Sequence, residues 1–211
     1  MTTTNATGRQ FSSNWTYSSK VSKLLGVFAL IAVVGWLVST LLTAIHLFAL
    51  PAIPSDAQVA GSIQVITSPW AYVFGIPLAT LGAVYYLTTI GFVLWWFDTK
   101  HPLILKVLTP ITASGVMASA YFVWLQLVPI GAICPFCMVS AAASVMLFGL
   151  ELGVLYETTS PPFDNLFNDL SNLVTQTNLA VVILPILMGI VSLGGLFIIP
   201  LLPLPDPVPF V

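Results

Sequence analysis

Charged residues are scarce in this chain. Of its 211 residues only five are Lys or Arg and seven are Asp or Glu, so that 6% are charged and 58% are hydrophobic. A soluble domain of this size needs a charged and solvated surface, which so few ionisable side chains cannot supply. The net charge of −2 also excludes a nucleic-acid-binding surface, because such surfaces are rich in Lys and Arg. The composition therefore predicts an integral membrane protein in contact with lipid.

Cysteine and histidine are nearly absent as well. The chain has two cysteines, Cys134 and Cys137, and two histidines, His46 and His101. Two cysteines are half of a tetrahedral zinc site and neither histidine is close to them in sequence, so no metal site is expected. Two thiols at this spacing on the first turn of a helix lie on one face and can close a disulfide, which stores and releases two electrons.

Apolar runs long enough to cross a membrane make up most of the chain. A helix needs roughly 20 apolar residues to span the hydrocarbon core. Four such runs, separated by links with proline, glycine or charge, predict an all-α membrane protein with a four-helix domain over residues 24–156. A fifth run, interrupted by glycines, follows it. The predicted membrane helices cover residues 24–50, 71–97, 103–128, 135–156 and 179–202.

The segments outside these helices are polar or rich in proline. Residues 1–23 contain many Ser, Thr and Asn and predict a polar tail. Residues 157–178 carry Phe and Leu at helical spacing in a polar background, which is typical of an amphipathic helix on a membrane surface. Residues 203–211 form a proline-rich C-terminal tail.

The basic residues predict the orientation, because Lys and Arg are enriched in loops that stay in the cytoplasm. Residues 1–23 and 157–178 are then cytoplasmic, whereas the loop 51–70, the cysteine pair and residues 203–211 lie outside. The pair would face an oxidising compartment, where disulfides persist. All five basic residues precede the first helix or lie between the second and third, namely Arg9, Lys20, Lys23, Lys100 and Lys106.

The sequence Cys134-Pro135-Phe136-Cys137 stands at the start of the fourth helix. Proline suits the first position of a helix, which puts Cys134 at the cap, where the helix dipole lowers the pKa of its thiol. Cys137 lies one turn deeper and is better placed to meet a ligand inside the bundle. A fixed disulfide or two inert thiols would be the alternative, but the motif and its position favour redox chemistry.

A loop, a helix and this cysteine motif follow one another in the order of a known family. The residues concerned are GSIQVITSPW at 61–70, FGIPL at 74–78, Gly82, Tyr86 and the CPFC motif at 134–137. With them the chain resembles the bacterial-type vitamin K epoxide reductase family over roughly residues 24–156. The resemblance implies a four-helix bundle around a quinone, such as menaquinone or ubiquinone, in a bacterial inner membrane. It also implies a thioredoxin-fold thiol donor as partner.

The resemblance further implies roles for single residues. Cys134 would exchange with the thiol donor, and Cys137 would face the quinone ring. Ser68 matches a family Ser or Thr near the quinone, although it could equally cap the second helix, since it precedes Pro69.

Two other positions are candidates for contact with a cofactor. His46, near the outer end of the first helix, is an ionisable group in a membrane segment and could contact a quinone or ligate a haem or chlorophyll. A lone membrane histidine is nevertheless more often a hydrogen-bonded core residue. Tyr85, Tyr86 and Gln126 could donate hydrogen bonds to a quinone, but bonding between helices explains them as well. The cofactor-binding candidates are therefore Ser68, Tyr86 and His46.

The sequence departs from the family pattern in the outer loop. Ser62 stands where the second loop cysteine is expected, and no cysteine occurs near Pro54 or Ser55, where the first is expected. A serine hydroxyl neither forms a disulfide nor leaves as a thiolate, so the internal relay of thiols cannot operate. A fused thioredoxin-like domain is not expected either.

Two functions agree with these observations. The first is a membrane thiol oxidoreductase that passes electrons from a dithiol to a quinone through the CPFC motif. The second is a degenerate family member without turnover, retained as a structural or quinone-holding subunit of a larger membrane complex. The second interpretation fits the missing loop cysteines and the glycines of the fifth helix, which allow close approach of neighbouring membrane subunits.

Overall fold

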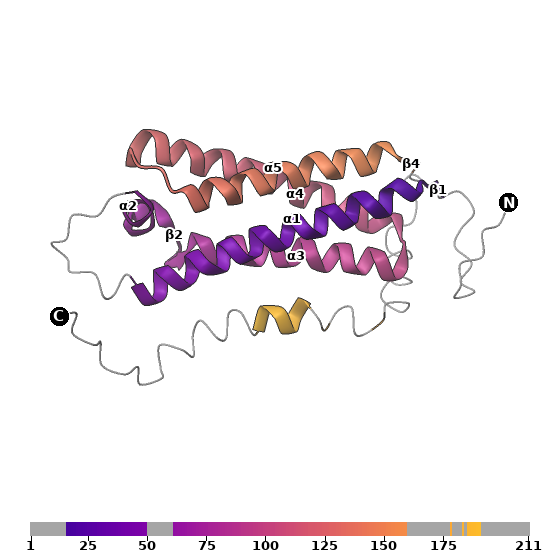
Figure 1. The fold of residues 1–211 in the computed structure, drawn as a ribbon, viewed down its shortest axis with the longest axis horizontal. Coiled ribbons are helices and arrows are strands. Elements are labelled where there is room, and N and C mark those ends of the chain that lie inside the picture. Colours follow the sequence, from indigo (N-terminus) through magenta and orange to yellow (C-terminus); the bar gives the residue numbers. More distant parts are fainter. Residues whose placement is uncertain (1–15, 50–60, 160–177, 179–182, 184, 191–211) are drawn as a thin grey trace, which may run out of the picture.

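Four long helices run antiparallel and form one elongated bundle (Figure 1). The computed structural model describes residues 16–49, 61–159, 178, 183 and 185–190. Each of the four helices, with its extensions, is long and apolar enough to cross a membrane. The prediction of an all-α membrane protein is therefore confirmed. The four are α1 (Ser19–Ala44), α3 (Leu78–Thr99), α4 (Pro102–Leu125) and α5 (Pro135–Tyr156).

Each helix of the bundle packs against two others. α1 lies between α3 and α5, and α4 closes the ring by contacting α5 and α3. The core between them contains large side chains that are almost completely buried, among them Phe28, Tyr86 and Trp96. Large apolar side chains also cover the outside, such as Leu30 and Met117, which are 69% and 73% exposed. Such an outer surface is stable only in an apolar solvent such as lipid.

Two helices continue beyond their regular ends as π-helical turns. α1 extends through η1 (Ile45–Ala49), and α4 extends through η4 (Gln126–Ile130), which contains Pro129. A π-helical turn shifts the side chains by one position relative to an α-helix and is frequent at functional sites. Both turns lie at the end of the bundle where α5 begins, so they set the directions of His46 and Gln126.

A short helix and a small hairpin cover this end of the bundle. α2 (Ser62–Thr67) is followed by η3 (Pro69–Ala71) and by the hairpin of β2 (Tyr72–Val73) and β3 (Ile76–Pro77). The hairpin turns at Phe74 and Gly75, both with positive φ, as a two-residue hairpin turn requires. The prediction that the second membrane helix begins near residue 71 is wrong, because residues 69–77 form these elements and α3 begins at Leu78.

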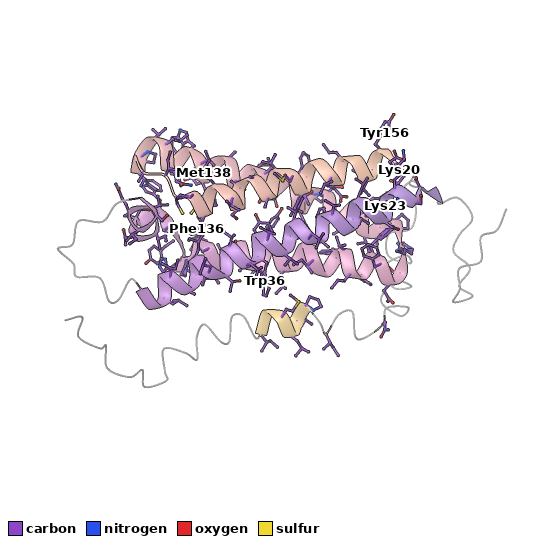
Figure 2. All side chains as sticks on the ribbon, viewed as in Figure 1. Lys20, Lys23, Trp36, Phe136, Met138 and Tyr156 are labelled. Atoms are coloured by element: carbon purple, nitrogen blue, oxygen red, sulfur yellow. The ribbon has the colours of Figure 1, made fainter. Side chains whose placement is uncertain are left out.

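The opposite end of the bundle carries the described basic residues. Lys20 and Lys23 lie there together with Tyr156, whereas Phe136 and Met138 mark the end with the cysteine motif (Figure 2). Lys20 Nζ pairs with Glu157 Oε1 at 3.2 Å, and β1 (Thr16–Tyr17) pairs with β4 (Thr158–Thr159). The polar tail predicted over residues 1–23 is thus shorter, because Ser18 caps α1 and accepts from the backbone N–H of Lys20.

Part of the C-terminal region lies against α3. Residues 185–190 are helical, and glycines on both sides allow a close approach. A Cβ at Gly91 would lie 3.4 Å from Pro185, and one at Gly189 would lie 2.9 Å from Leu87. The rest of the predicted fifth helix (179–202), most of the amphipathic segment (157–178) and the tail 203–211 lie outside the described residues.

Candidate functional site

The two cysteines form a hydrogen-bonded pair at the start of α5. Cys134 is the N-cap residue and Pro135 the first helical residue, as the sequence predicts. The backbone N–H of Cys137 donates to Cys134 Sγ at 3.3 Å, and the two sulfur atoms lie 2.7 Å apart. Both are free thiols. Closing a disulfide between them requires almost no movement of the backbone.

The surroundings of Cys134 favour its thiolate. Its pKa is lowered to about 6, chiefly because the Cys137 thiol donates a hydrogen bond to its sulfur. Burial acts against this, while the backbone N–H groups of Cys137 and Phe136 and the Ser62 hydroxyl add further hydrogen bonds. At neutral pH the reduced pair therefore consists mainly of a Cys134 thiolate and a Cys137 thiol.

Gln126 holds the link that leads into the cysteine motif. Its Oε1 accepts the backbone N–H of Cys134 at 2.8 Å, and its backbone oxygen accepts the N–H of Ala132 at 3.1 Å. Gly131, just before Ala132, has a φ of +66°, a conformation that glycine adopts without strain. Gln126 is 3% exposed, so these bonds are shielded from water and fix the position of Cys134.

α2 packs against Cys134, which is buried. The buried Val65 and Ile66 of α2 pack with Cys134 and Leu42 in a small apolar cluster. Ser62, the first residue of α2, lies close enough to the Cys134 sulfur to help lower the pKa of its thiol. Because Cys134 is 0% exposed, an external thiol has no direct access to its sulfur in this conformation.

A cavity of about 360 Å³ lies beneath α2, between the four long helices. Cys137 lines it, and so do three of the residues that the sequence singled out, His46, Ser68 and Tyr86. Cys134 does not line it. Within the part of the chain that the structure describes, no Asp, Glu, Lys or Arg is among the lining residues, and the titratable groups there are Cys, His and Tyr. Its other polar residues are Ser39, Tyr85, Ser114, Ser119, Gln126, Ser140 and Ser144.

His46 connects the cavity to the hairpin. Its Nε2 lies 2.6 Å from the hydroxyl of Tyr72, and the two rings meet edge to face at 4.7 Å. His46 is 8% exposed and Tyr72 is 40% exposed. The histidine is therefore hydrogen-bonded, as the commoner interpretation expected, and lines the cavity at the same time.

Ser68 does not act as the predicted cap. It occupies the N-cap position of η3, but its side chain makes no capping hydrogen bond. The hydroxyl instead donates to the backbone oxygen of Val65 at 2.8 Å, within the preceding helix. Its oxygen keeps free acceptor capacity beside the cavity, while its proton is already in use.

The neighbouring tyrosines Tyr85 and Tyr86 differ in their hydrogen bonds. The Tyr86 hydroxyl donates to the backbone oxygen of Ser140 and lies 2.8 Å from Ser144 Oγ, which ties α3 to α5. The buried Tyr85 hydroxyl has no partner in the described part of the chain. Ser144 lies near it, but the Ser144 hydroxyl bonds to Tyr86 and Ser140. A Cβ at Gly115 would lie 2.2 Å from the Tyr85 oxygen, so only glycine fits there.

Sequence reasoning missed several residues around this cavity. Ser140 and Ser144 follow Cys137 by three and seven positions, so helical periodicity would have put them on its face. Tyr72 had no such signal, because only the hairpin and the π-helical turn bring it to His46. Within the described ranges no three His, Cys, Asp or Glu side chains come together in a way that could hold a metal ion.

One buried carboxyl lies away from the cavity. Glu151 on α5 is 0% exposed, and Thr109 of α4 donates to its Oε1 at 3.2 Å. Its other oxygen has no partner among the described residues. Glu151 therefore lies inside the bundle.

Comparison with known proteins gives one match. The profile described as the vitamin K epoxide reductase family matches residues 26–152, which includes the four long helices nearly in full and the whole cysteine motif. A comparison with curated proteins gives no match.

Proposed function

The chain belongs to the vitamin K epoxide reductase family, whose members are membrane thiol oxidoreductases that work with a quinone. On this premise we propose that it passes two electrons from an external dithiol to a quinone through Cys134 and Cys137. The observation that carries the proposal is the placement of the pair. One sulfur is buried against α2 at the end of the bundle where α5 begins, and the other lines the cavity.

The reaction has two halves that balance. A thiolate of the donor attacks the Cys134 sulfur of the oxidised pair, and Cys137 leaves as the thiolate. The second donor thiol then attacks the mixed disulfide, which releases the oxidised donor and the reduced pair. In the second half the reduced pair gives two electrons to the quinone and closes its disulfide again. Two protons and two electrons reach the quinone for each disulfide formed.

The size and lining of the cavity support a quinone as the acceptor. A volume of about 360 Å³ is within the range of small-molecule pockets. Its lining is mainly apolar and accommodates a ring, while His46, Ser68 and Tyr86 offer polar groups to the two ring oxygens. Of these three, Tyr86 is the most firmly held, because its hydroxyl bonds to α5. We therefore assign His46 to direct contact with a ring oxygen, and Ser68 and Tyr86, whose protons are used in bonds within the protein, to shaping the cavity wall.

The donor that we propose is a thioredoxin-fold protein on the outer side of a bacterial inner membrane. Lys20 and Lys23 lie at the end of the bundle away from the cysteine motif, and Lys100 lies in the link between α3 and α4 at that same end, which supports a cytoplasmic N-terminus. The donor thiolate would reach Cys134 when α2 moves aside. Only a short helix with two buried residues must be displaced for that, Val65 and Ile66.

The proposal is tested with the purified full-length chain in vesicles that contain ubiquinone or menaquinone. With a reduced thioredoxin-fold dithiol protein as donor, we expect quinol formation and donor oxidation in equal amounts. Cys137→Ala and Cys134→Ala abolish turnover, whereas Met138→Leu, next to the motif, keeps it. Turnover that survives Cys137→Ala would refute the electron path.

A second function is favoured by the burial of Cys134 beneath Ser62. A family member that holds a quinone without exchanging thiols would keep the cavity and lose the access path. The helical residues 185–190, packed through glycine on α3, show how a further helix docks on this bundle. This alternative predicts co-purification with other membrane subunits at fixed stoichiometry in mild detergent. An isolated monomer with thiol-dependent quinone reduction argues against it.

A further inference from the structure

Reduction of a quinone needs one proton more than the reduced cysteine pair carries. The ring takes up two electrons and two protons to become a quinol. The pair holds two electrons, but Cys134 is largely a thiolate at neutral pH, so only the Cys137 thiol brings a proton. The second proton must come from another group at the cavity or from water beyond it.

The cavity has few groups that could deliver a proton. Among the described residues, its titratable lining residues are Cys137, His46, Tyr85 and Tyr86, and none of these residues in its wall is Asp, Glu, Lys or Arg. The Tyr86 proton is used in a hydrogen bond to Ser140, and the Tyr85 hydroxyl is packed against Gly115 without a partner that could replace its proton. Among these described residues, only His46 is hydrogen-bonded to a further titratable side chain that reaches the surface.

That second group is Tyr72, which leads from His46 to the surface. The hydroxyl of Tyr72 and Nε2 of His46 are 2.6 Å apart, a short and strong hydrogen bond. The edge-to-face ring contact at 4.7 Å holds the two side chains in this relation. Tyr72 is 40% exposed and lies outside the four spanning helices, at the end of the bundle, while the histidine beside it is buried.

We infer that Tyr72 and His46 form a proton relay that supplies the second proton of quinone reduction from the outer aqueous side. The inference rests on the proposed quinone reduction and adds two residues with a defined task. The Tyr72 hydroxyl donates to Nε2, so Nδ1 carries the ring proton. Nδ1–H gives its proton to the quinone oxygen, Nε2 takes the proton of Tyr72, and water restores the tyrosine.

The step balances in atoms and charge. The Cys134 thiolate, the Cys137 thiol, the quinone and one proton from outer water give the Cys134–Cys137 disulfide and the quinol. The imidazole passes the proton from one nitrogen to the other, so no separate imidazolium has to persist in the apolar wall. The tyrosine hydroxyl ends the step as it began, whereas the imidazole ends it protonated on Nε2 and returns to the Nδ1–H tautomer by proton exchange before the next turnover.

The test measures only the second half-reaction, so it does not depend on the identity of the donor. The full chain in detergent or vesicles is reduced with dithiothreitol, freed of it and mixed with a soluble ubiquinone analogue. Quinol formation is followed in a single turnover. The variants are His46→Ala, Tyr72→Phe, which removes only the hydroxyl, and His101→Ala, which removes the other histidine at the far end of the bundle.

A relay predicts a distinct pattern of rates. A positioned proton donor typically contributes at least about 100-fold, so His46→Ala slows quinol formation by about that factor, and Tyr72→Phe slows it by about tenfold. Added imidazole restores much of the rate of His46→Ala, because it can occupy the space of the lost ring. Equilibrium binding of the quinone analogue changes less than about threefold in both variants, and His101→Ala reacts like the parent protein.

Three outcomes would overturn the inference. Wild-type rates in both His46→Ala and Tyr72→Phe show that the protons arrive elsewhere. A slow His46→Ala that imidazole does not rescue, together with an unaffected Tyr72→Phe, makes the histidine structural only. A reduced parent protein that forms no quinol overturns the proposed function itself, and this outcome is recognised before any variant is made.

Discussion

The pair Tyr85 and Tyr86 offers a stringent test of the hydrogen bonding around the cavity. The two residues are adjacent on α3, and their rings are in contact at 5.0 Å. Replacing either by Phe removes one oxygen and leaves the ring in place. Tyr86 joins α3 to α5 through Ser140 and Ser144, whereas the Tyr85 hydroxyl has no partner in the described part of the chain.

The expected magnitudes follow from these contacts. A hydrogen bond between membrane helices contributes about 0.6 kcal/mol on average and about 1.7 kcal/mol at most. Tyr86 takes part in one bond as donor and at least one as acceptor, so Tyr86→Phe lowers the free energy of unfolding by roughly 1–3 kcal/mol. Tyr85→Phe removes a buried hydroxyl that is unpaired, so it leaves this free energy unchanged or raises it by about 1 kcal/mol.

Unfolding of the purified protein in mixed micelles, with increasing mole fraction of denaturing detergent, measures both variants against the parent. The ring contact and the helix are the same in both, so each variant is the control for the other. We expect Tyr86→Phe to be less stable than Tyr85→Phe by roughly 1–4 kcal/mol, the sum of the two effects. Equal losses in the two variants, or a greater loss in Tyr85→Phe, would refute the assignment of structural bonding to Tyr86 alone.

Three further predictions concern the packing and the dithiol. In Gly35→Ala the new Cβ would overlap the ring of Tyr86, so thermal unfolding shows a decrease of roughly 1–3 kcal/mol in the free energy of unfolding. Gly26→Ala on the same helix, whose new Cβ would have no atom within 4 Å, shows no such decrease. In Ser62→Cys the new thiol takes the place of the hydroxyl beside Cys134, so mild oxidation forms a disulfide between positions 62 and 134. Mass spectrometry of the digested protein detects this disulfide, and its absence would contradict the contact between the two residues. In the reduced protein the thiolate absorbance titrates with a midpoint of about pH 6, and Cys134→Ser abolishes this transition. The pKa of Cys134 is lower in the folded than in the unfolded protein. The thiolate therefore stabilises the fold fully above about pH 8.5, and this contribution is lost as the pH falls through about 6.

Helix α5 shows how far local sequence reasoning extends in this protein. Its predicted bounds, residues 135–156, agree with the structure, because Pro135 begins a helix and the apolar run ends at a charged residue. The start of α3 was missed by seven residues. Residues 71–77 are apolar and look like membrane helix, but they form a 3₁₀ end and a hairpin, whose turn depends on positive φ at Phe74.

The candidate site divides in the same way. The CPFC spacing and the helix start already implied a thiolate-favouring Cys134, because these effects act within one helical turn. The closeness of His46, Ser68, Tyr86 and Cys137 could be expected from the resemblance to a family, but no local pattern implies it, since the residues come from four separate elements.

The sequence by itself determined that the chain is an all-α membrane protein, that it has four long spanning helices in this order, and that one dithiol stands at a helix start. These properties follow from apolar length, scarcity of charge and the spacing of two cysteines, which are local. Only the tertiary structure decided that α2 buries Cys134, that Tyr86 bonds to α5 while Tyr85 does not, and that Tyr72 reaches His46. Each of these depends on π-helical turns, a hairpin and helix contacts that bring distant residues within 3 Å, and such distances are set by packing rather than by neighbouring residues.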